Sequence, residues 1–318
     1  NSDSGDKARW VYVVEGGDTG WRMEYQYLPD RGPFNREKIW HPQNAEQPAY
    51  IVPPILNFAD GPSGLAYYPG TGLLEHFNGR FFLCDFRGGP GNSGVRTFKL
   101  KPKGASFEMT DAEQSFWSIL ATDVDFGPDG SVYVSDWVNG WNGEGKGRIH
   151  RFYSEEIAKS EVSQQVKKLL AEGLKSKNVL ELAELLSHSD RRIRQEAQFE
   201  LADRKEVTAL QEVALKSDST LARIHAIWGI GQLARREKDT AALLSNLVPL
   251  TTVDDAEVRA QAAKLFGEAK FVAAYDSIVK LLKDSEPRVQ YFAAVALGKF
   301  SKPAAIPAIV ELLATNND

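Results

Sequence analysis

The sequence predicts a chain in two parts: a portion of a β-propeller in the first half and an α-solenoid of paired helices in the second. Two stretches of the first half, residues 61–100 and 121–152, share one strand-turn-strand layout. From Leu180 onward a different motif recurs, with the spacing of helical repeats. One pattern gives way to the other at about residue 154, so the expected fold class is multidomain β plus α.

Both β units have the same order of features. A first strand leads through a tight glycine turn into a second strand, which ends in Asp followed by an aromatic residue, at Asp85 in one unit and Asp136 in the other. A glycine-rich loop and a strand of alternating polar and apolar residues follow. Asn-Gly at 78–79 and Pro-Asp-Gly at 128–130 favour hairpin turns. Units of this kind are typical of propeller blades.

The repeated Asp-aromatic strand end argues against an ordinary β-sandwich, which is the alternative for these strands. Residues 1–60 add strand segments at 10–14 and 21–25 and a proline-rich loop at 29–54. The first domain, residues 1–153, thus holds about three blades, whereas a propeller needs at least about four. We therefore expect the missing blades to precede this chain, which looks like an internal fragment of a longer protein.

The second part repeats an Asp, an aliphatic-Arg pair, an Ala, and an apolar residue followed by Gly or Ala. The marker positions Arg194, Arg223, Arg259 and Gln290 are 29, 36 and 31 residues apart. Helix pairs with such a period stack into a solenoid, which usually serves for binding or spacing. This domain is expected to span residues 178–318, after a connecting helical segment at 154–177.

Helical periodicity predicts one amphipathic helix at 155–171 and then four pairs. The predicted pairs are 179–186 with 191–202, 207–215 with 221–234, 241–250 with 256–266, and 272–282 with 287–300. A residue able to cap free amides precedes the second helix of each pair: Asp190, Asp218, Asp255, and Asp284 or Ser285. Pro303 and Pro307 begin a last helix.

The composition excludes several classes of function. The net charge of -5, without a Lys/Arg tract, gives no reason to expect nucleic-acid binding. No apolar run is long enough to predict a membrane span. Five His and one Cys leave little material for a transition-metal site, and no Cys-x-x-Cys-His motif attaches haem c within this chain. The sequence also lacks a phosphate loop, a dinucleotide fingerprint and a Gly-x-Ser-x-Gly motif.

The strand ends of the β part carry the candidate cofactor-binding or channel residues. Asp85 and Asp136 each open into a glycine-rich loop, and Arg87 and Trp137 follow them. These side chains are placed to face a ligand pocket. The alternative is that each Asp ties down the next loop or braces the packing of the blades, and its repetition in both units favours that role.

Two kinds of residue are candidates for a catalytic base. Asp123 and Asp125 share one face of the strand at 121–126, and the first strand of a blade lines the central channel of a propeller. Asp123 is therefore a candidate base or metal ligand, although channels lined by acids also occur without chemistry. His41 and His76 lie in loops of the β part, where either is a candidate base, but a lone His is more often structural.

Two further groups have a functional and a structural interpretation. Asp3 and Asp6 flank Gly5 in a turn that offers the oxygen ligands preferred by Ca²⁺, and a plain polar turn is the alternative. The arginines of the solenoid motif are candidates for a ligand-binding ladder. We instead expect each to bond the turn of the neighbouring repeat, often through its Asp. They are Arg194, Arg223 and Arg259.

These motifs resemble known families. The solenoid motif is similar to HEAT repeats, in particular the short bacterial kind. Residues 126–137, with the closing strand at 147–151, resemble blades of the glucose/sorbosone dehydrogenase type. Residues 5–12 and 15–22 are similar to a family of membrane-bound dehydrogenases of planctomycete-like bacteria, in which such a propeller precedes HEAT repeats and often a haem c domain.

The resemblance implies a fragment of an extracytoplasmic sugar or alcohol dehydrogenase that uses the quinone PQQ and Ca²⁺. The propeller would form part of the active-site channel, and the HEAT repeats would dock a protein partner or a separate downstream haem c domain. The His that acts as base in related enzymes would lie upstream of Asn1, so the fragment alone is expected to be inactive. The alternative is a non-catalytic propeller-solenoid scaffold that binds carbohydrate or protein.

Overall fold

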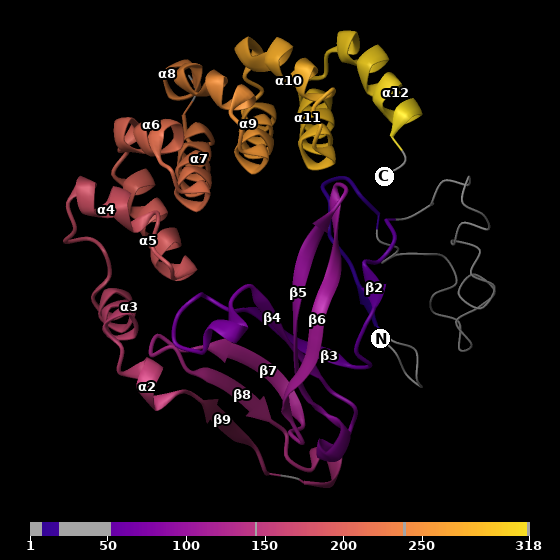
Figure 1. Ribbon diagram of the computed structural model, residues 1–318, viewed down its shortest axis with the longest axis vertical. Coiled ribbons are helices and arrows are strands. Elements are labelled where there is room, and N and C mark those ends of the chain that lie inside the picture. Colours follow the sequence, from indigo (N-terminus) through magenta and orange to yellow (C-terminus); the bar gives the residue numbers. More distant parts are fainter. Residues whose placement is uncertain (1–7, 19–51, 144, 238–239, 317–318) are drawn as a thin grey trace.

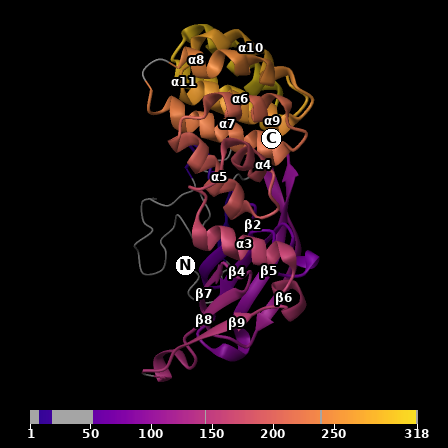
Figure 2. The same cartoon turned by 90° about the vertical axis from the view of Figure 1, so that its left-hand side faces the viewer.

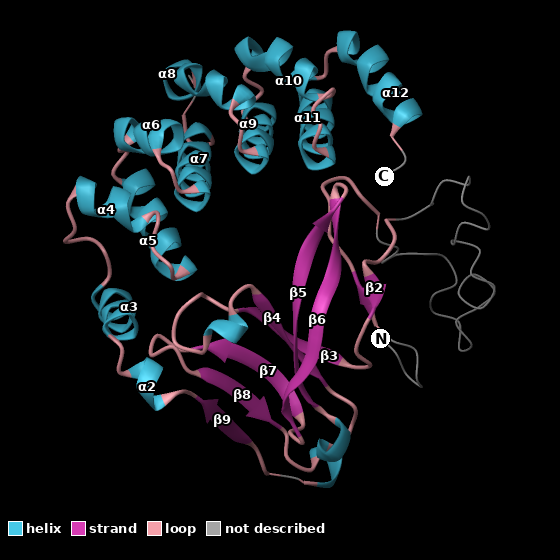
Figure 3. Ribbon diagram, in the orientation of Figure 1, coloured by secondary structure: helices cyan, strands magenta, loops and turns pink. Residues whose placement is uncertain are grey.

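The computed structural model describes residues 8–18, 52–143, 145–237 and 240–316. Strands occupy the first half and helices the second, and the change falls between β9 (Arg148–Phe152) and α2 (Glu155–Ala158). The helices form an arc beside the sheets (Figure 1), and a side view places the helical repeats and the sheets at opposite ends of the molecule (Figure 2). Figure 3 shows the same separation by type of element. The predicted order, β part then helical part, is confirmed.

The described strands form three small antiparallel sheets, with the orders β3-β4-β5-β6, β7-β8-β9 and β1-β2. Their bounds are β1 Arg9–Trp10, β2 Leu56–Asn57, β3 Pro62–Tyr67, β4 Arg80–Asp85, β5 Gly94–Lys103, β6 Ser106–Trp117, β7 Ala121–Phe126 and β8 Val132–Asp136. Among the described residues no sheet closes into a barrel. The propeller prediction is therefore confirmed only as far as small antiparallel sheets.

Strand β6 is the main difference from the prediction, in which the first β unit ended at Leu100. It forms a long hairpin with β5, and its register shifts twice along that hairpin. Exposed polar residues such as Asp111 interrupt its apolar alternation, and Asp111 has a positive φ of 52°. These irregularities hide the strand from a search for period two.

The two larger sheets lie together through their first strands, β3 and β7. Ser63 Oγ donates a hydrogen bond to the Ala121 carbonyl at 3.2 Å. Gly64 needs to lack a side chain, because a Cβ there would lie 2.6 Å from the Asp123 Cα. Both sheets contribute to one buried apolar cluster that includes Cys84, and burial raises the pKa of the Cys84 thiol to about 12. The two sheets therefore share a core.

The helices of the second half stack in pairs. Their bounds are α3 Glu161–Glu172, α4 Val179–Leu185, α5 Arg191–Asp203, α6 Val207–Lys216, α7 Thr220–Ala234, α8 Ala241–Leu244, α9 Ala256–Glu268, α10 Tyr275–Leu281, α11 Pro287–Phe300 and α12 Ile306–Thr315. The second helix of each pair, α5, α7, α9 or α11, lies on the inner side of the arc (Figure 1). One continuous core runs from Val166 to Ala305. No helix in the described ranges is long and apolar enough to cross a membrane.

Three predicted helices are interrupted. The helix predicted at 155–171 breaks at Ser160, whose hydroxyl caps α3 by accepting a hydrogen bond from the Ser163 amide. In the range 241–250, α8 gives way to a 3₁₀ helix that contains Pro249, because proline has no amide to continue an α-helical ladder. The range 272–282 begins with a 3₁₀ turn, Val272–Ala274, before α10.

The predicted capping residues are only partly right. Asp190 and Asp255 cap α5 and α9. Asp190 accepts a hydrogen bond from the Arg192 amide, and Asp255 accepts the amides of Glu257 and Val258. Asp218 does not cap α7, because the next residue, Ser219, takes that place. Asp284 lies two residues before the N-cap residue of α11 and accepts the amide of that residue.

The solenoid is joined to the sheets at its first helix pair. Thr71, in the loop between β3 and β4, donates a hydrogen bond from Oγ1 to the buried Asp190 carboxylate at 2.5 Å. The Arg192 guanidinium bonds the same carboxylate at 2.8 Å and donates to the Gly127 carbonyl at 2.8 Å. Gly70 lies against the Ser189 carbonyl, only 2.5 Å from where a Cβ would stand. The first repeat is therefore fixed to two loops of the β part.

A second contact joins the sheets to the fourth helix pair. Arg288 of α11 donates a hydrogen bond to the Tyr12 hydroxyl at 3.2 Å. The Tyr12 ring meets the Phe107 ring edge-on at the turn of the β5–β6 hairpin, with 5.1 Å between centroids. Lys299 pairs with Glu15 at 2.8 Å. The arc is thus attached to the β part near both of its ends (Figure 1).

Candidate functional site

Asp85, a predicted ligand at the end of β4, is fully buried and bonded on both oxygens. Its Oδ1 accepts the Asp60 amide at 2.9 Å, just before β3, and its Oδ2 accepts the Arg96 guanidinium at 2.7 Å, from β5. Burial alone would raise the pKa of this carboxyl, but the Asp60 amide and Arg96 outweigh it and hold the pKa below its ordinary value. Asp85 is an ionised brace between three segments of one sheet.

Asp136 makes the same set of bonds at the end of β8. Its Oδ1 accepts the Leu120 amide at 3.1 Å, just before β7, and its Oδ2 lies 2.9 Å from Nε2 of His150, in β9. Burial would raise the pKa of this carboxyl, but His150 and the Val138 amide lower it. The equivalence extends to the basic partner. Arg96 and His150 each lie two residues beyond the residue that pairs with the Asp in its sheet.

The aromatic and basic neighbours of these acids gather at the same strand ends. Trp137 stacks on Phe86 with 6.0 Å between centroids, and Trp141 meets both rings edge-on. Arg87 pairs with Asp60 at 3.0 Å and with Asp85 at 3.2 Å. The structure therefore brings all four predicted strand-end residues together, but the carboxylates are already engaged. This geometry favours the bracing role over a ligand-binding role.

The remaining predicted site residues have varied surroundings. Asp123 and Asp125 are exposed on one face of β7, and each accepts a hydrogen bond from the amide of the residue that follows it. His76 lies 2.6 Å from Glu113 on the surface. His41 lies outside the described residues, as do Asp3 and Asp6, the predicted Ca²⁺ ligands. In the described part of the chain no group of three or more His, Cys, Asp or Glu side chains is arranged to hold a metal ion.

Removing the charge of the Asp85 carboxylate distinguishes a structural role for this residue from a ligand-binding role. We expect Asp85→Asn to lower the free energy of unfolding by about 2 kcal/mol, because a buried amide cannot replace the charged partner of Arg96. Asp123→Asn, at an exposed position, should change it by less than about 0.5 kcal/mol. Urea titration followed by circular dichroism measures both values, and equal small losses would contradict the bracing role.

The arginines of the solenoid motif also have structural partners. Arg259 forms a bidentate pair with Asp284 of the next repeat, at 2.8 Å on both oxygens. Arg194 donates instead to carbonyls in the turn of its own repeat, and Arg223 donates to the Ala214 carbonyl of its own repeat. The expectation of a bond to the neighbouring repeat holds for one of the three. Each of the three guanidinium groups is held by at least one hydrogen bond within the solenoid, which favours the structural interpretation over a ligand-binding ladder.

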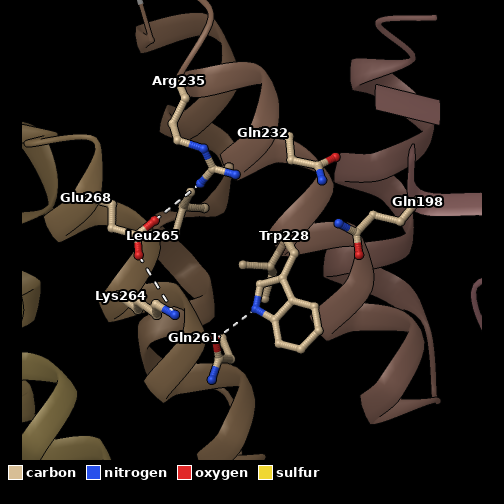
Figure 4. A pocket seen from close by; sticks show the side chains of 10 residues that line it. Gln198, Trp228, Gln232, Arg235, Gln261, Lys264, Leu265 and Glu268 are labelled. Carbon is tan, nitrogen blue, oxygen red and sulfur yellow. Dashed lines mark hydrogen bonds and ion pairs between the residues drawn. The ribbon is translucent and has the colours of Figure 1, made fainter. Parts of the chain in front are cut away.

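A groove on the inner face of the arc was not predicted. It has a volume of about 260 Å³ and lies across α5, α7 and α9. Its most prominent side chain is Trp228, which is 42% exposed and fixed by a hydrogen bond from Nε1 to Gln261 Oε1 at 2.9 Å. Figure 4 shows the indole at the centre of the groove, with Gln198 and Gln232 on one side and Gln261 on the other.

Charged side chains close one end of the groove. Arg235, the C-cap residue of α7, and Lys264 of α9 both approach the Glu268 carboxylate, at 3.4 and 3.8 Å (Figure 4). Beside Trp228 the imidazole of His225 lies 2.8 Å from Gln198 Oε1. Burial lowers the pKa of His225 to about 4, so this ring is neutral at pH 7. The groove combines an aromatic face, amide groups and an excess of positive charge.

The bond that fixes Trp228 is the start of a longer chain of contacts. Gln261 Nε2 donates to Glu257 at 2.7 Å, and Glu257 accepts Arg288 Nε at 2.6 Å. Arg288 in turn bonds Tyr12 of the β part. The available sequence signal was the position of Trp228, five residues after the marker Arg223, on a helix otherwise rich in small and aliphatic residues.

Comparison with known proteins supports the helical half of the prediction. A family model of HEAT repeats matches residues 244–318. No curated protein matches the chain. The HEAT resemblance is therefore confirmed over those residues, and HEAT repeats commonly mediate protein interactions. The resemblance to a dehydrogenase family finds no support in these comparisons and stays a prediction.

Proposed function

We propose that this chain is a scaffold that binds a polypeptide partner on the inner face of its solenoid. Trp228 carries the proposal, because a large aromatic side chain is held in one orientation and yet exposed in a groove. Anchored aromatic residues of this kind dominate the binding energy of protein interfaces. The HEAT match over part of the same solenoid is consistent with this role.

Selection from a library of random peptides tests the proposal. Peptides enriched on the immobilised full chain should lose about 30-fold in affinity for a Trp228→Ala variant, because an anchor residue is worth about 2 kcal/mol or more. Trp141→Ala is a matched control, since Trp141 is also exposed but lies in the β part. Failure to enrich any peptide, or equal loss with both variants, would exclude binding at this groove.

We further propose that the two larger sheets are blades of a propeller. The matching carboxylate braces at Asp85 and Asp136, the meandering strand order and the adjacent first strands β3 and β7 support it. An experimental structure of the full-length natural protein tests this proposal. Further sheets arranged around the β3–β7 side would support it, and a second sheet stacked face-on, as in a sandwich, would contradict it.

Oxidation of a sugar or alcohol with PQQ and Ca²⁺, which the family resemblance implies, stays a prediction for the parent protein. The strand-end carboxylates do not fit a cofactor site, because both oxygens of each are bonded within the protein. An extracytoplasmic location and a downstream haem c partner likewise stay predictions. Dye reduction by the intact parent protein with PQQ and Ca²⁺ present measures the activity directly.

A further inference from the structure

The inner face of the solenoid carries one row of exposed side chains that changes in character along the arc. Phe199, Trp228 and Lys264 each stand five residues after the marker arginine of their repeat, on α5, α7 and α9. Equivalent positions in stacked repeats lie on the same face and form a row. Phe199 is 37% exposed, Trp228 42%, and the Lys264 side chain 41%. The row thus presents two aromatic rings followed by a cation.

The cationic end of the row has room for another carboxylate. Arg235 and Lys264 share Glu268, and neither contact is short. Glu257, on the same helix as Lys264, is occupied by Arg288 and by Gln261. Two cations around one acid leave a local positive charge, which complements an acidic group on a ligand.

The spacing of the row fits one backbone conformation. Packed helices lie about 8–10 Å apart. A polyproline II segment rises about 3.1 Å per residue with three residues per turn, so every third side chain points the same way, about 9 Å along. The amide of Gln232, beside Trp228 in Figure 4, can bond the free backbone of such a segment. A ligand crossing the helices in this way would meet one repeat with each third residue.

Resting on the proposed function, we infer that the groove, together with Phe199 next to its lining residue Gln198, recognises an extended segment with two apolar side chains and an acidic one at every third position. The apolar residues lie over Phe199 and Trp228, and the acid pairs with Lys264 and Arg235. The recognised pattern is apolar-x-x-apolar-x-x-acidic, read in either chain direction. The ligand is a segment of a polypeptide partner. The acidic residue at one end of its motif determines which ligand residue lies over each repeat.

A pair of synthetic peptides tests this inference by calorimetry on the full chain. The probe carries Leu, Phe and Glu at every third position, with Pro or Ala between them and both termini capped. Its partner peptide has Lys in place of Glu. The unmodified protein should bind the Glu peptide about tenfold more tightly than the Lys peptide. A Lys264→Glu variant should reverse that order.

Two controls keep the result interpretable. Lys216→Glu reverses a charge on the outer helix α6 and should leave the tenfold preference unchanged. Lys264→Gln adds no repulsion to Glu268, so it remains informative if Lys264→Glu does not fold, and it should bring the two peptides within about threefold.

The outcomes distinguish the two proposals. If substitution of Lys264 leaves the preference for the Glu peptide unchanged, the acidic residue does not pair with Lys264 and this inference is wrong. It is also wrong if the Glu peptide fails to bind while the binding of library peptides still depends on Trp228. In both cases the scaffold function survives. Loss of Trp228-dependent binding by every peptide overturns the scaffold function itself.

Discussion

Replacing Asp190 by alanine should lower the free energy of unfolding by about 3 kcal/mol, one of the two largest effects that we expect from a single substitution. The carboxylate is fully buried, caps α5, and holds both Thr71 and the Arg192 guanidinium. Its removal leaves the Arg192 guanidinium without its carboxylate partner, with only backbone carbonyls to bond, at a junction that is mostly shielded from water. Urea unfolding followed by circular dichroism measures the loss.

Two comparisons show which bonds cause that loss. Thr71→Val removes only the Thr71–Asp190 bond, leaves the Arg192–Gly127 bond across the junction in place, and should cost about 1 kcal/mol. A loss from Asp190→Ala no larger than that from Thr71→Val would mean that Arg192 finds other partners.

The same carboxylate gives a pH dependence with a definite sign. Burial would raise the pKa of Asp190, but the hydrogen bonds from Arg192 and Thr71 lower it below its ordinary value of 3.8. The unfolded chain therefore binds more protons between those two pKa values. The contribution of Asp190 is present above about pH 3.8 and is lost as the pH falls through the folded pKa. Asp190→Asn should flatten the acid limb of a stability profile.

Substituting alanine for Gly72 should also destabilise the fold by about 3 kcal/mol. Gly72 has a φ of 103°, and a Cβ there would stand 2.2 Å from the Cα of Gly130. Gly130 belongs to the turn before β8, so the obstacle is backbone that cannot rotate away. Alanine must therefore push apart the loops that hold the first helix pair.

Gly88→Ala is the matched control for this clash. Gly88 has a similarly positive φ of 78°, but nothing lies within 4 Å of its Cβ position. It should lose only the conformational cost of a left-handed residue, about 1 kcal/mol. Thermal unfolding of both variants separates the two contributions, and equal losses would show that the Gly72–Gly130 contact is easily relaxed.

The helical repeats were predictable because each one restates the same local rules. Periodic apolar positions, marker arginines and capping acids recur, so an error at one repeat is corrected by the others. The failures lie where a single residue overrides the pattern, as Ser160 and Pro249 do. Strand β6 was not predicted, because its bulges disrupt the alternation of polar and apolar residues that identifies a strand.

For the candidate sites, the sequence showed which positions are equivalent but not which contacts they make. The equivalence of Asp85 and Asp136 was visible in the sequence, but their engagement was not, because Arg96 and His150 are distant in sequence and are placed by strand pairing. Trp228 lies on a helix whose other residues are mostly buried. Whether it faces a groove depends on how three helices stack, which no local pattern specifies.

The attachment of the arc at α5 and α11 has a mechanical consequence. A solenoid with free ends behaves as a spring, because small rotations at each repeat add up along its length. Here both ends of that spring are clamped to the same body, through Thr71–Asp190 at one end and through Tyr12–Arg288 and Glu15–Lys299 at the other. A change in the curvature of the arc must break the contacts at one of these two ends. The motions that would widen the inner face are therefore restricted even without a bound partner.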